Sequence, residues 1–164
     1  MYIILAGYEN LEVIKELDKI VDVYLPDFKY ASNVLAKKYS GVDKYVQNVE
    51  KCLIEMKRQV GNNIFDENGM IKRGLIVRHL ILPNNIINSK LVLKWIADNL
   101  GKDTYISIMS QYFPTYLSKN DDLLNRKITE FERDCIYDYI QKLGFTNGYI
   151  QQLGENEENY VPEF

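Results

Sequence analysis

The sequence is poor in the residues that hold metals and disulfides. Its 164 residues include two cysteines, Cys52 and Cys135, and one histidine, His79. Each cysteine lies within an amphipathic helical pattern, which favours a buried, reduced thiol over a disulfide. Two cysteines and one histidine cannot form a ligand set with zinc or iron–sulfur spacing, so a metal held by this chain alone would need carboxylates. The sequence groups no carboxylates convincingly for that role.

Excess basic charge and long apolar runs are missing as well. The net charge is −3 and the basic residues are scattered, which excludes the basic footprint of proteins that bind nucleic acid or anionic membranes. No apolar run is long enough to cross a bilayer, and the start of the chain lacks the features of a signal peptide. We therefore expect a cytoplasmic protein with neither nucleic acid nor membrane as its partner.

The hydrophobic residues that are present predict an α/β fold. They make up 46% of the chain, which is enough for one domain with a core. Continuous aliphatic runs between helical patterns are typical of parallel strands, because helices cover their faces. Such runs occupy residues 2–6, 21–26, 75–82 and 105–109. Their order predicts right-handed βαβ units in a single domain over residues 1–153, followed by an acidic tail, 154–164, that we expect to fray.

Short polar motifs predict where several elements begin and turn. We expect Asn10, Ser32 and Ser89 to cap helices, and a capping box to begin at Thr129. The segment Asp66-Glu67-Asn68-Gly69 lies between apolar pairs, which indicates a small β-hairpin inserted before the strand at 75–82.

An acid and a base follow the second predicted strand. Asp27 and Lys29 are two residues apart, so their side chains share one face if the chain stays extended. Such a pair can bind a zwitterion, with the lysine taking a carboxylate and the aspartate taking a cation or ammonium group. The alternative is a solvated ion pair, which is common and weak.

Arg78 interrupts the apolar strand at 75–82, on the same predicted face as Leu80 and Leu82. A charge in that position must be paired or functional, so Arg78 belongs either to a ligand site or to a structural ion pair. His79 faces the other way, toward the covering helices, and we interpret it as a hydrogen-bonded structural histidine.

Parallel α/β folds bind ligands at the carboxyl ends of their strands. We therefore expect Asp27, Lys29 and Arg78 to converge at one end of the sheet. Gln111 and Tyr112 end the next predicted strand and are further candidates for the same ligand site, although these two residues alone are a weak indication.

Four segments occur in an order that matches a known family. They are Leu25-Pro26-Asp27-Phe28-Lys29-Tyr30, Glu55-Met56-Lys57-Arg58-Gln59-Val60-Gly61, Gly74-Leu75-Ile76-Val77-Arg78-His79-Leu80-Ile81-Leu82-Pro83 and Ile106-Ser107-Ile108-Met109-Ser110-Gln111-Tyr112. Together they resemble the C-terminal half of radical S-adenosylmethionine proteins similar to pyruvate formate-lyase-activating enzyme. The resemblance implies a partial (β/α) barrel of about four or five parallel strands, with covering helices and the small inserted hairpin.

The resemblance also implies roles for the strand-end residues. Lys29 matches a lysine that contacts the carboxylate of S-adenosylmethionine, and Asp27 matches an aspartate near it that is associated with a monovalent cation. Arg78 matches an arginine that faces the active site. Gln111 and Tyr112 fall where activating enzymes carry a tyrosine and a cofactor-contacting histidine, and that histidine is absent here.

The family uses a [4Fe-4S] cluster on a three-cysteine loop to cleave S-adenosylmethionine reductively. Activating enzymes of this type then form a radical on a glycine of a partner enzyme. In this chain the cysteine loop would lie upstream of Met1, and without three thiolates no cluster supplies the electron. We expect a radical-SAM-like fragment that is not catalytic alone, arising from a truncated gene, a split gene or an incomplete sequence. The alternative is a non-catalytic module that binds a small ligand or another protein.

Simple geometry supports the expectation of a missing part. A full (β/α) barrel takes about 250 residues, and four or five strands cannot close a ring. The strand at 2–6 would then be an exposed apolar edge, which proteins normally cover. We expect this edge to mediate self-association, or to meet a partner that supplies the missing N-terminal half barrel. By resemblance, a glycyl-radical-type enzyme is a further possible partner.

Overall fold

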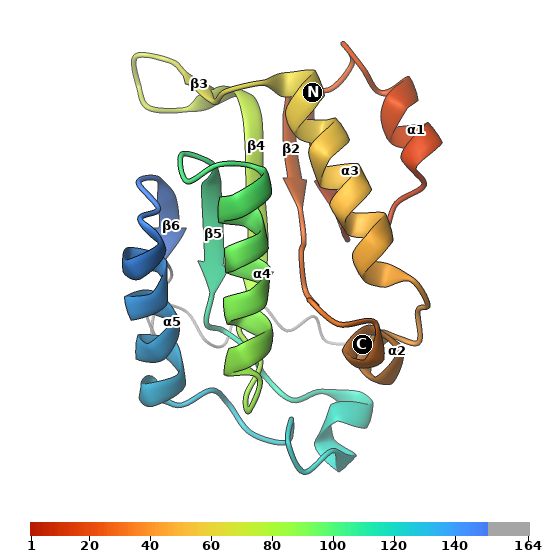
Figure 1. Ribbon diagram of the computed structural model, residues 1–164, viewed down its shortest axis with the longest axis vertical. Coiled ribbons are helices and arrows are strands. Elements are labelled where there is room, and N and C mark those ends of the chain that lie inside the picture. Colours follow the sequence, from red (N-terminus) through yellow and green to blue (C-terminus); the bar gives the residue numbers. More distant parts are fainter. Residues whose placement is uncertain (151–164) are drawn as a thin grey trace.

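An open sheet of parallel strands forms the centre of the computed structural model, which describes residues 1–150 (Figure 1). The parallel strands follow the order β1-β2-β4-β5-β6, and the short strand β3 pairs antiparallel with β4. Their bounds are β1 Tyr2–Leu5, β2 Val23–Pro26, β3 Ile64–Phe65, β4 Ile71–Leu80, β5 Tyr105–Met109 and β6 Gly148–Ile150. The predicted partial barrel with an inserted hairpin is confirmed.

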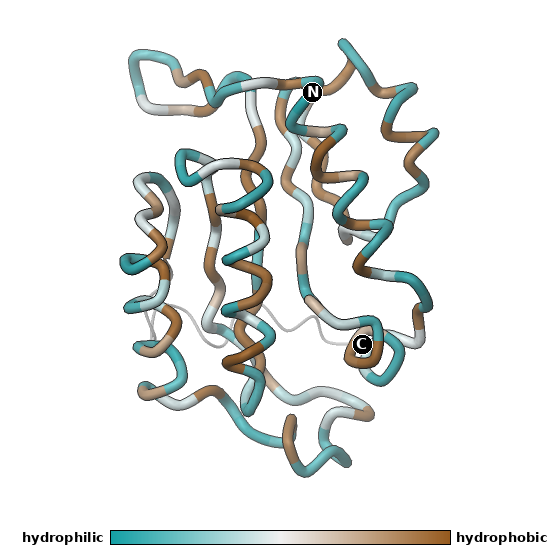
Figure 2. Tube along the Cα trace, in the orientation of Figure 1, coloured by the Kyte–Doolittle hydropathy of each residue, from teal (hydrophilic) through white to brown (hydrophobic). Residues whose placement is uncertain are grey.

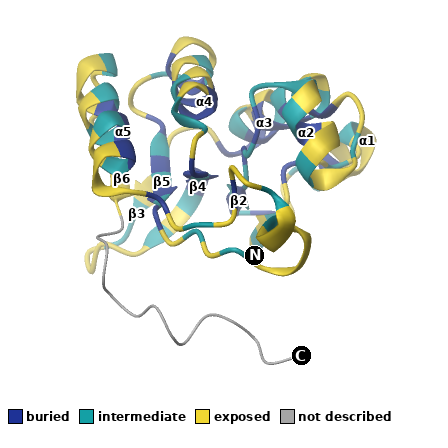
Figure 3. Cartoon of the chain, turned by 90° about the horizontal axis from the view of Figure 1, so that it is seen from below, coloured by how far each residue is buried: buried dark blue, intermediate teal, exposed yellow. Residues whose placement is uncertain are grey.

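The α-helices lie on one side of this sheet (Figure 3). They are α1 Leu11–Glu16, α2 Asn33–Ser40, α3 Tyr45–Val60, α4 Ile86–Asn99 and α5 Glu130–Leu143, and a 3₁₀ helix, η1, spans Tyr116–Asn120. None of the α-helices in residues 1–150 covers the opposite face, which we call the open face. None of the helices in these residues is long and apolar enough to cross a membrane.

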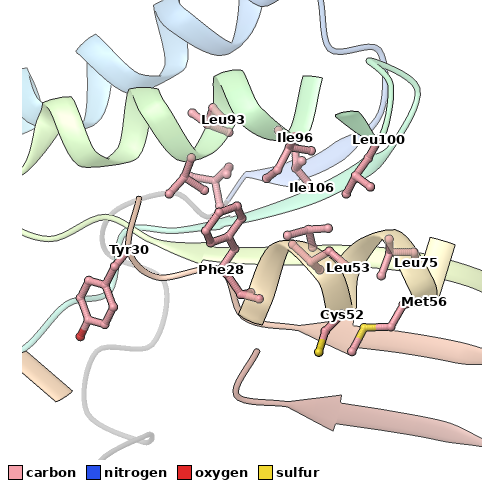
Figure 4. Close-up of a cluster of buried hydrophobic side chains, with 14 of the residues drawn as sticks. Phe28, Tyr30, Cys52, Leu53, Met56, Leu75, Leu93, Ile96, Leu100 and Ile106 are labelled. Carbon is pink, nitrogen blue, oxygen red and sulfur yellow. The ribbon is translucent and has the colours of Figure 1, made fainter. Parts of the chain in front are cut away.

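The core fills the space between the sheet and the helices. In α3, Val49, Leu53, Met56 and Val60 are buried at helical spacing and face the strands. Figure 2 shows the resulting mixture of apolar and polar positions along each helix. In Figure 4, α3 and α4 pack against the strands. The buried side chains at this contact include Leu53, Met56, Leu75, Leu93, Ile96 and Ile106.

Three of the four predicted helix starts are confirmed. The side chains of Asn10 and Ser32 accept hydrogen bonds from the first turns of α1 and α2, and Thr129 forms a capping box with α5. The prediction for Ser89 is wrong. Asn85 precedes α4, and Ser89 lies buried in the helix, where its hydroxyl contacts a ring nitrogen of His79.

Two boundaries differ from the sequence prediction. The hairpin's second arm and the predicted core strand form one strand, β4, which runs from Ile71 to Leu80. Because β4 ends at Leu80, the strand alternation that predicted a shared face for Arg78 and Leu82 does not extend to Leu82, which is 8% exposed in the core cluster. The predicted domain boundary at residue 153 and the acidic tail lie outside the described residues and stay predictions.

Candidate functional site

Three charged side chains meet at the carboxyl ends of β2 and β4. Asp27 and Arg78 pair as an isolated bridge just beyond β2, and Arg78 Nε lies 3.0 Å from Asp27 Oδ1. Lys29 Nζ lies 3.5 Å from Asp27 Oδ2. Leu75 and Val77 belong to the core under the helices, so the alternation of β4 places Arg78 on the open face. We refer to these three side chains as the rim cluster.

The rim cluster is half-buried and carries an excess of positive charge. The side chains of Asp27, Arg78 and Lys29 are 14%, 26% and 39% exposed. One carboxylate faces two cations, so the cluster has a net charge of +1. Arg78 Nε and Asp27 Oδ1 are close but do not meet hydrogen-bond geometry, and both atoms are buried without a hydrogen-bond partner. Buried polar atoms are normally satisfied, so this pair leaves capacity for a further polar group.

Phe28 anchors the segment after β2 in the core. Its ring is 1% exposed and packs edge-on against Trp95 of α4. Its N–H donates to the carbonyl of Arg78 at 2.8 Å, and the N–H of Asp27 donates to the carbonyl of Leu5 at 2.9 Å. Because Phe28 is anchored in the core, its neighbours Asp27 and Lys29 are directed to the other face.

His79 holds the same segment from the helix side. Its Nδ1 lies 2.7 Å from the carbonyl oxygen of Phe28, and its Nε2 lies 2.8 Å from the hydroxyl of Ser89. A carbonyl can only accept, so Nδ1 carries the proton and the Ser89 hydroxyl donates to Nε2. Burial lowers the pKa of His79 to about 4, which keeps the ring neutral. The structural interpretation of this histidine is confirmed.

Two further side chains fix the backbone around Lys29. The N–H of Lys29 donates to the hydroxyl oxygen of Tyr45 at 2.9 Å. The amide of Asn88 donates to the carbonyl of Lys29 at 2.9 Å and accepts from the N–H of Ala31 at 2.8 Å. The sequence analysis missed Tyr45 and Asn88. The adjacent polar residues Asn88 and Ser89 within an otherwise apolar helical pattern were the available signal.

Gln111 and Tyr112 contribute differently from the rim cluster. Gln111 is exposed just beyond β5. The Tyr112 ring packs against the core, and its hydroxyl donates to the carbonyl of Leu124 at 3.1 Å. This hydroxyl is therefore already engaged in holding the loop before α5.

The cysteines and other possible metal ligands of residues 1–150 do not fit an iron–sulfur cluster. Cys52 is buried in α3, where its thiol contacts the carbonyl of Glu9 at 3.4 Å, and burial raises the pKa of the thiol. Cys135 is a separate free cysteine on α5. Within residues 1–150, no three His, Cys, Asp or Glu side chains are grouped to hold a metal ion.

A pocket of about 650 Å³ lies elsewhere, among the starts of α2, α4 and α5. One wall is formed by Glu132, which pairs with Arg126 at 2.7 Å and accepts from the N–H of Asn84 at 2.6 Å. The amide oxygen of Asn84 accepts from Arg126 at 2.8 Å. These polar groups satisfy one another, so the wall is a structural connection between α5 and the loop before α4.

Among the comparisons with known proteins, the one with solved structures shows the fold. No family model matches the chain. The chain is 28% identical over 136 residues to an uncharacterized protein of Methanocaldococcus jannaschii, a match that covers 82% of this chain and 36% of that protein. A domain of pyruvate-formate lyase-activating enzyme from Bacteroides vulgatus is structurally similar, with a TM-score of 0.63 and 12% identity, over 92% of this chain and 80% of that one.

At 12% identity this structural likeness shows the fold alone. The chain therefore has the α/β fold of a domain of pyruvate-formate lyase-activating enzyme, as the sequence resemblance predicted. The chain spans about a third of the curated relative that it matches, 36% of its length.

Proposed function

We propose that this chain is a radical-SAM-like half barrel that binds a small zwitterion, of which S-adenosylmethionine is the leading candidate, at the rim cluster. The observation that carries the proposal is the convergence of Asp27, Lys29 and Arg78 at the carboxyl ends of neighbouring parallel strands. That location is where parallel α/β sheets bind ligands. The half-buried setting would make hydrogen bonds to charged groups stronger than on an open surface.

The charges of the cluster match the amino-acid part of such a ligand. The net charge of +1 favours one carboxylate, for which Lys29 and Arg78 are the donors. Asp27 is the acceptor for the ligand's ammonium group, which would otherwise meet two cations. The hydrogen bonds around Phe28 and Lys29 hold the backbone in place before the ligand arrives, which lowers the entropy lost on binding.

Binding is the extent of the activity that we assign to this chain. The family's reductive cleavage needs a cluster, and the chain carries two cysteines in all. We therefore assign it no catalytic step and place any radical chemistry on a partner that supplies the cluster ligands. A glycyl-radical-type partner enzyme follows from the resemblance only.

Isothermal titration calorimetry with S-adenosylmethionine tests the proposal directly. Lys29→Ala and Arg78→Ala should each raise Kd about 10- to 100-fold, because each removes a charge-assisted hydrogen bond worth about 1.5–3 kcal/mol. Lys37→Ala is the matched control, because Lys37 is an exposed lysine of α2 that pairs with Asp43 at 2.8 Å and does not belong to the rim cluster. L-Methionine should compete with S-adenosylmethionine, because it carries the same zwitterion, and adenosine should not.

Equal binding by the wild type and both rim variants would exclude the assigned site. A second candidate function is an interaction module with no small ligand, which the mutual pairing of Asp27 with both cations favours. Under that alternative the melting temperature would be the same with and without S-adenosylmethionine, whereas binding to the folded state raises it.

A further inference from the structure

The residues level with the rim cluster form a row across the open face. Figure 1 shows β2, β4, β5 and β6 side by side, and their parallel registers place Asp27 beside Arg78, Arg78 beside Ser107, and Ser107 beside Tyr149. Residues opposed in this way share a face of the sheet. Ile106 belongs to the core under the helices, so Ser107, and with it Tyr149, projects to the open face. We call Asp27, Arg78, Ser107 and Tyr149 the open-face row.

An exposed aromatic ring lies at the far end of this row. Tyr149 is 52% exposed. Its ring centroid lies 6.2 Å from that of Tyr105, which in turn lies 5.0 Å from that of Phe65. These contacts hold the Tyr149 ring from one side and leave about half of the residue accessible. Aromatic pairs across strands stabilise a sheet, and an exposed ring also offers its π-face to the planar group of a ligand.

The stretch between the rim cluster and Tyr149 is low and bordered by apolar side chains. Ser107 is the smallest side chain of the open-face row, and it stands between an arginine and a tyrosine. The next row toward the amino ends of the strands places Ile76, 5% exposed, beside Tyr105. Neighbouring strands lie about 4.8 Å apart, so Tyr149 is two strand spacings, or about 10 Å, from Arg78.

We propose that the zwitterion bound at the rim cluster extends over Ser107 and stacks a planar ring on Tyr149. This inference rests on the proposed function and narrows its ligand class to amino acids that carry an aromatic or heteroaromatic ring on a spacer. A phenylalanine or tyrosine ligand holds its ring one carbon from the amino-acid carbon, which is too short for a span of about 10 Å. S-Adenosylmethionine carries its adenine beyond a thioether-like chain and a ribose, which is long enough.

Isothermal titration calorimetry with two ligands tests the ring subsite. Tyr149→Ala should raise the Kd of S-adenosylmethionine about 5- to 150-fold, the range expected for one lost stacking contact. The same variant should bind L-methionine as the wild type does, because methionine has no ring to place there. Tyr149→Phe keeps the ring and should bind both ligands normally. Phe131→Ala is the matched control, because Phe131 is a 70% exposed aromatic residue of α5, on the helix side of the sheet.

A second variant tests the path between the two ends. Ser107→Leu places a larger apolar side chain between Arg78 and Tyr149 without removing a group from either. It should raise the Kd of S-adenosylmethionine several-fold more than the Kd of L-methionine. Equal effects on the two ligands would show that the ligand does not pass over Ser107.

The outcomes separate this inference from the proposed function. If Lys29→Ala weakens the binding of S-adenosylmethionine and Tyr149→Ala does not, the rim cluster stands and the ring subsite is excluded. Equal losses for both ligands in Tyr149→Ala would also exclude a subsite for the ring. A lower melting temperature of Tyr149→Ala with an unchanged Kd would assign the aromatic contacts to stability alone. A wild type that binds neither ligand would overturn the proposed function, and this inference with it.

Discussion

At the scale of single residues, His79 makes stability depend on pH. Burial lowers its pKa from about 6.5 to about 4 in the folded state, so the unfolded chain binds the proton more tightly. The stabilisation is fully present above pH 6.5 and is lost as pH falls toward 4, by about 3 kcal/mol in all. Urea unfolding at several pH values in this window should show the loss as a decreasing midpoint.

His79→Gln separates this effect from the carboxylates. A glutamine amide can still donate to the Phe28 carbonyl and accept from Ser89, but it does not titrate. The variant should show a shallower pH dependence between 6.5 and 4 than the wild type. Identical slopes for both proteins would mean that His79 is not the source of the dependence.

Single residues also show the reach of sequence reasoning. Arg78 was identified because a charge interrupts an apolar strand, and strand alternation was enough to direct His79 toward the helices. The partners of His79 were not predictable, because they depend on how α4 lies across β4. That arrangement brings Ser89 and Asn88 to the segment after β2. Asn88 bonds there to Lys29 and Ala31, which precede it by 59 and 57 residues in the chain.

At the scale of elements, the start of α5 is held by one buried carboxylate. The side chain of Glu132 is 6% exposed and accepts hydrogen bonds from Arg126, Asn84 and Thr129. Arg126 lowers the pKa of Glu132 to about 2. Glu132→Gln should lower the free energy of unfolding by about 1–3 kcal/mol at neutral pH, since Arg126 keeps part of its hydration.

Urea unfolding of Glu132→Gln beside Glu130→Gln measures this effect. Glu130 lies in the same first turn of α5 and is exposed, so its variant should be nearly neutral. The wild-type advantage should disappear as pH falls from 4.5 toward 2, because the unfolded carboxyl protonates first. Equal losses in the two variants would show that the network at Glu132 does not stabilise the helix start.

Helix starts were predictable where one polar residue precedes an apolar pattern, as at Asn10, Ser32 and Thr129. The prediction of a cap at Ser89 was wrong because the Ser89 hydroxyl bonds to His79, whereas a capping side chain accepts from a backbone N–H of its own helix. The hairpin was predictable from Asn-Gly, but the continuity of β4 was not. Gly74 allows that continuity, because a Cβ there would lie 2.3 Å from the side chain of Asn63.

At the scale of the whole molecule, the α-helices of residues 1–150 form one layer on one face of the sheet and leave the open face without a helix. All-parallel sheets normally have both faces covered or close into a barrel. The chain length and strand count predicted this opening, since five strands cannot complete the ring of an eight-stranded barrel. Which contacts form on the open face was not predictable, because strand periodicity fixes only which side chains point there.

The predicted domain boundary gives the last test at this scale. The described sheet ends with β6, and the core residues found within residues 1–150 lie before it. Residues 154–164 include four glutamates and neither lysine nor arginine, a composition that favours solvation over packing. Truncation after Leu153 should therefore leave the melting temperature unchanged in a circular dichroism scan.

Truncation after Phe145 is the contrasting variant. It removes β6, which pairs with β5 through Ile106 to Ile108, and should lower the melting temperature by several degrees. A comparable loss after the shorter truncation would extend the folded domain into the acidic segment.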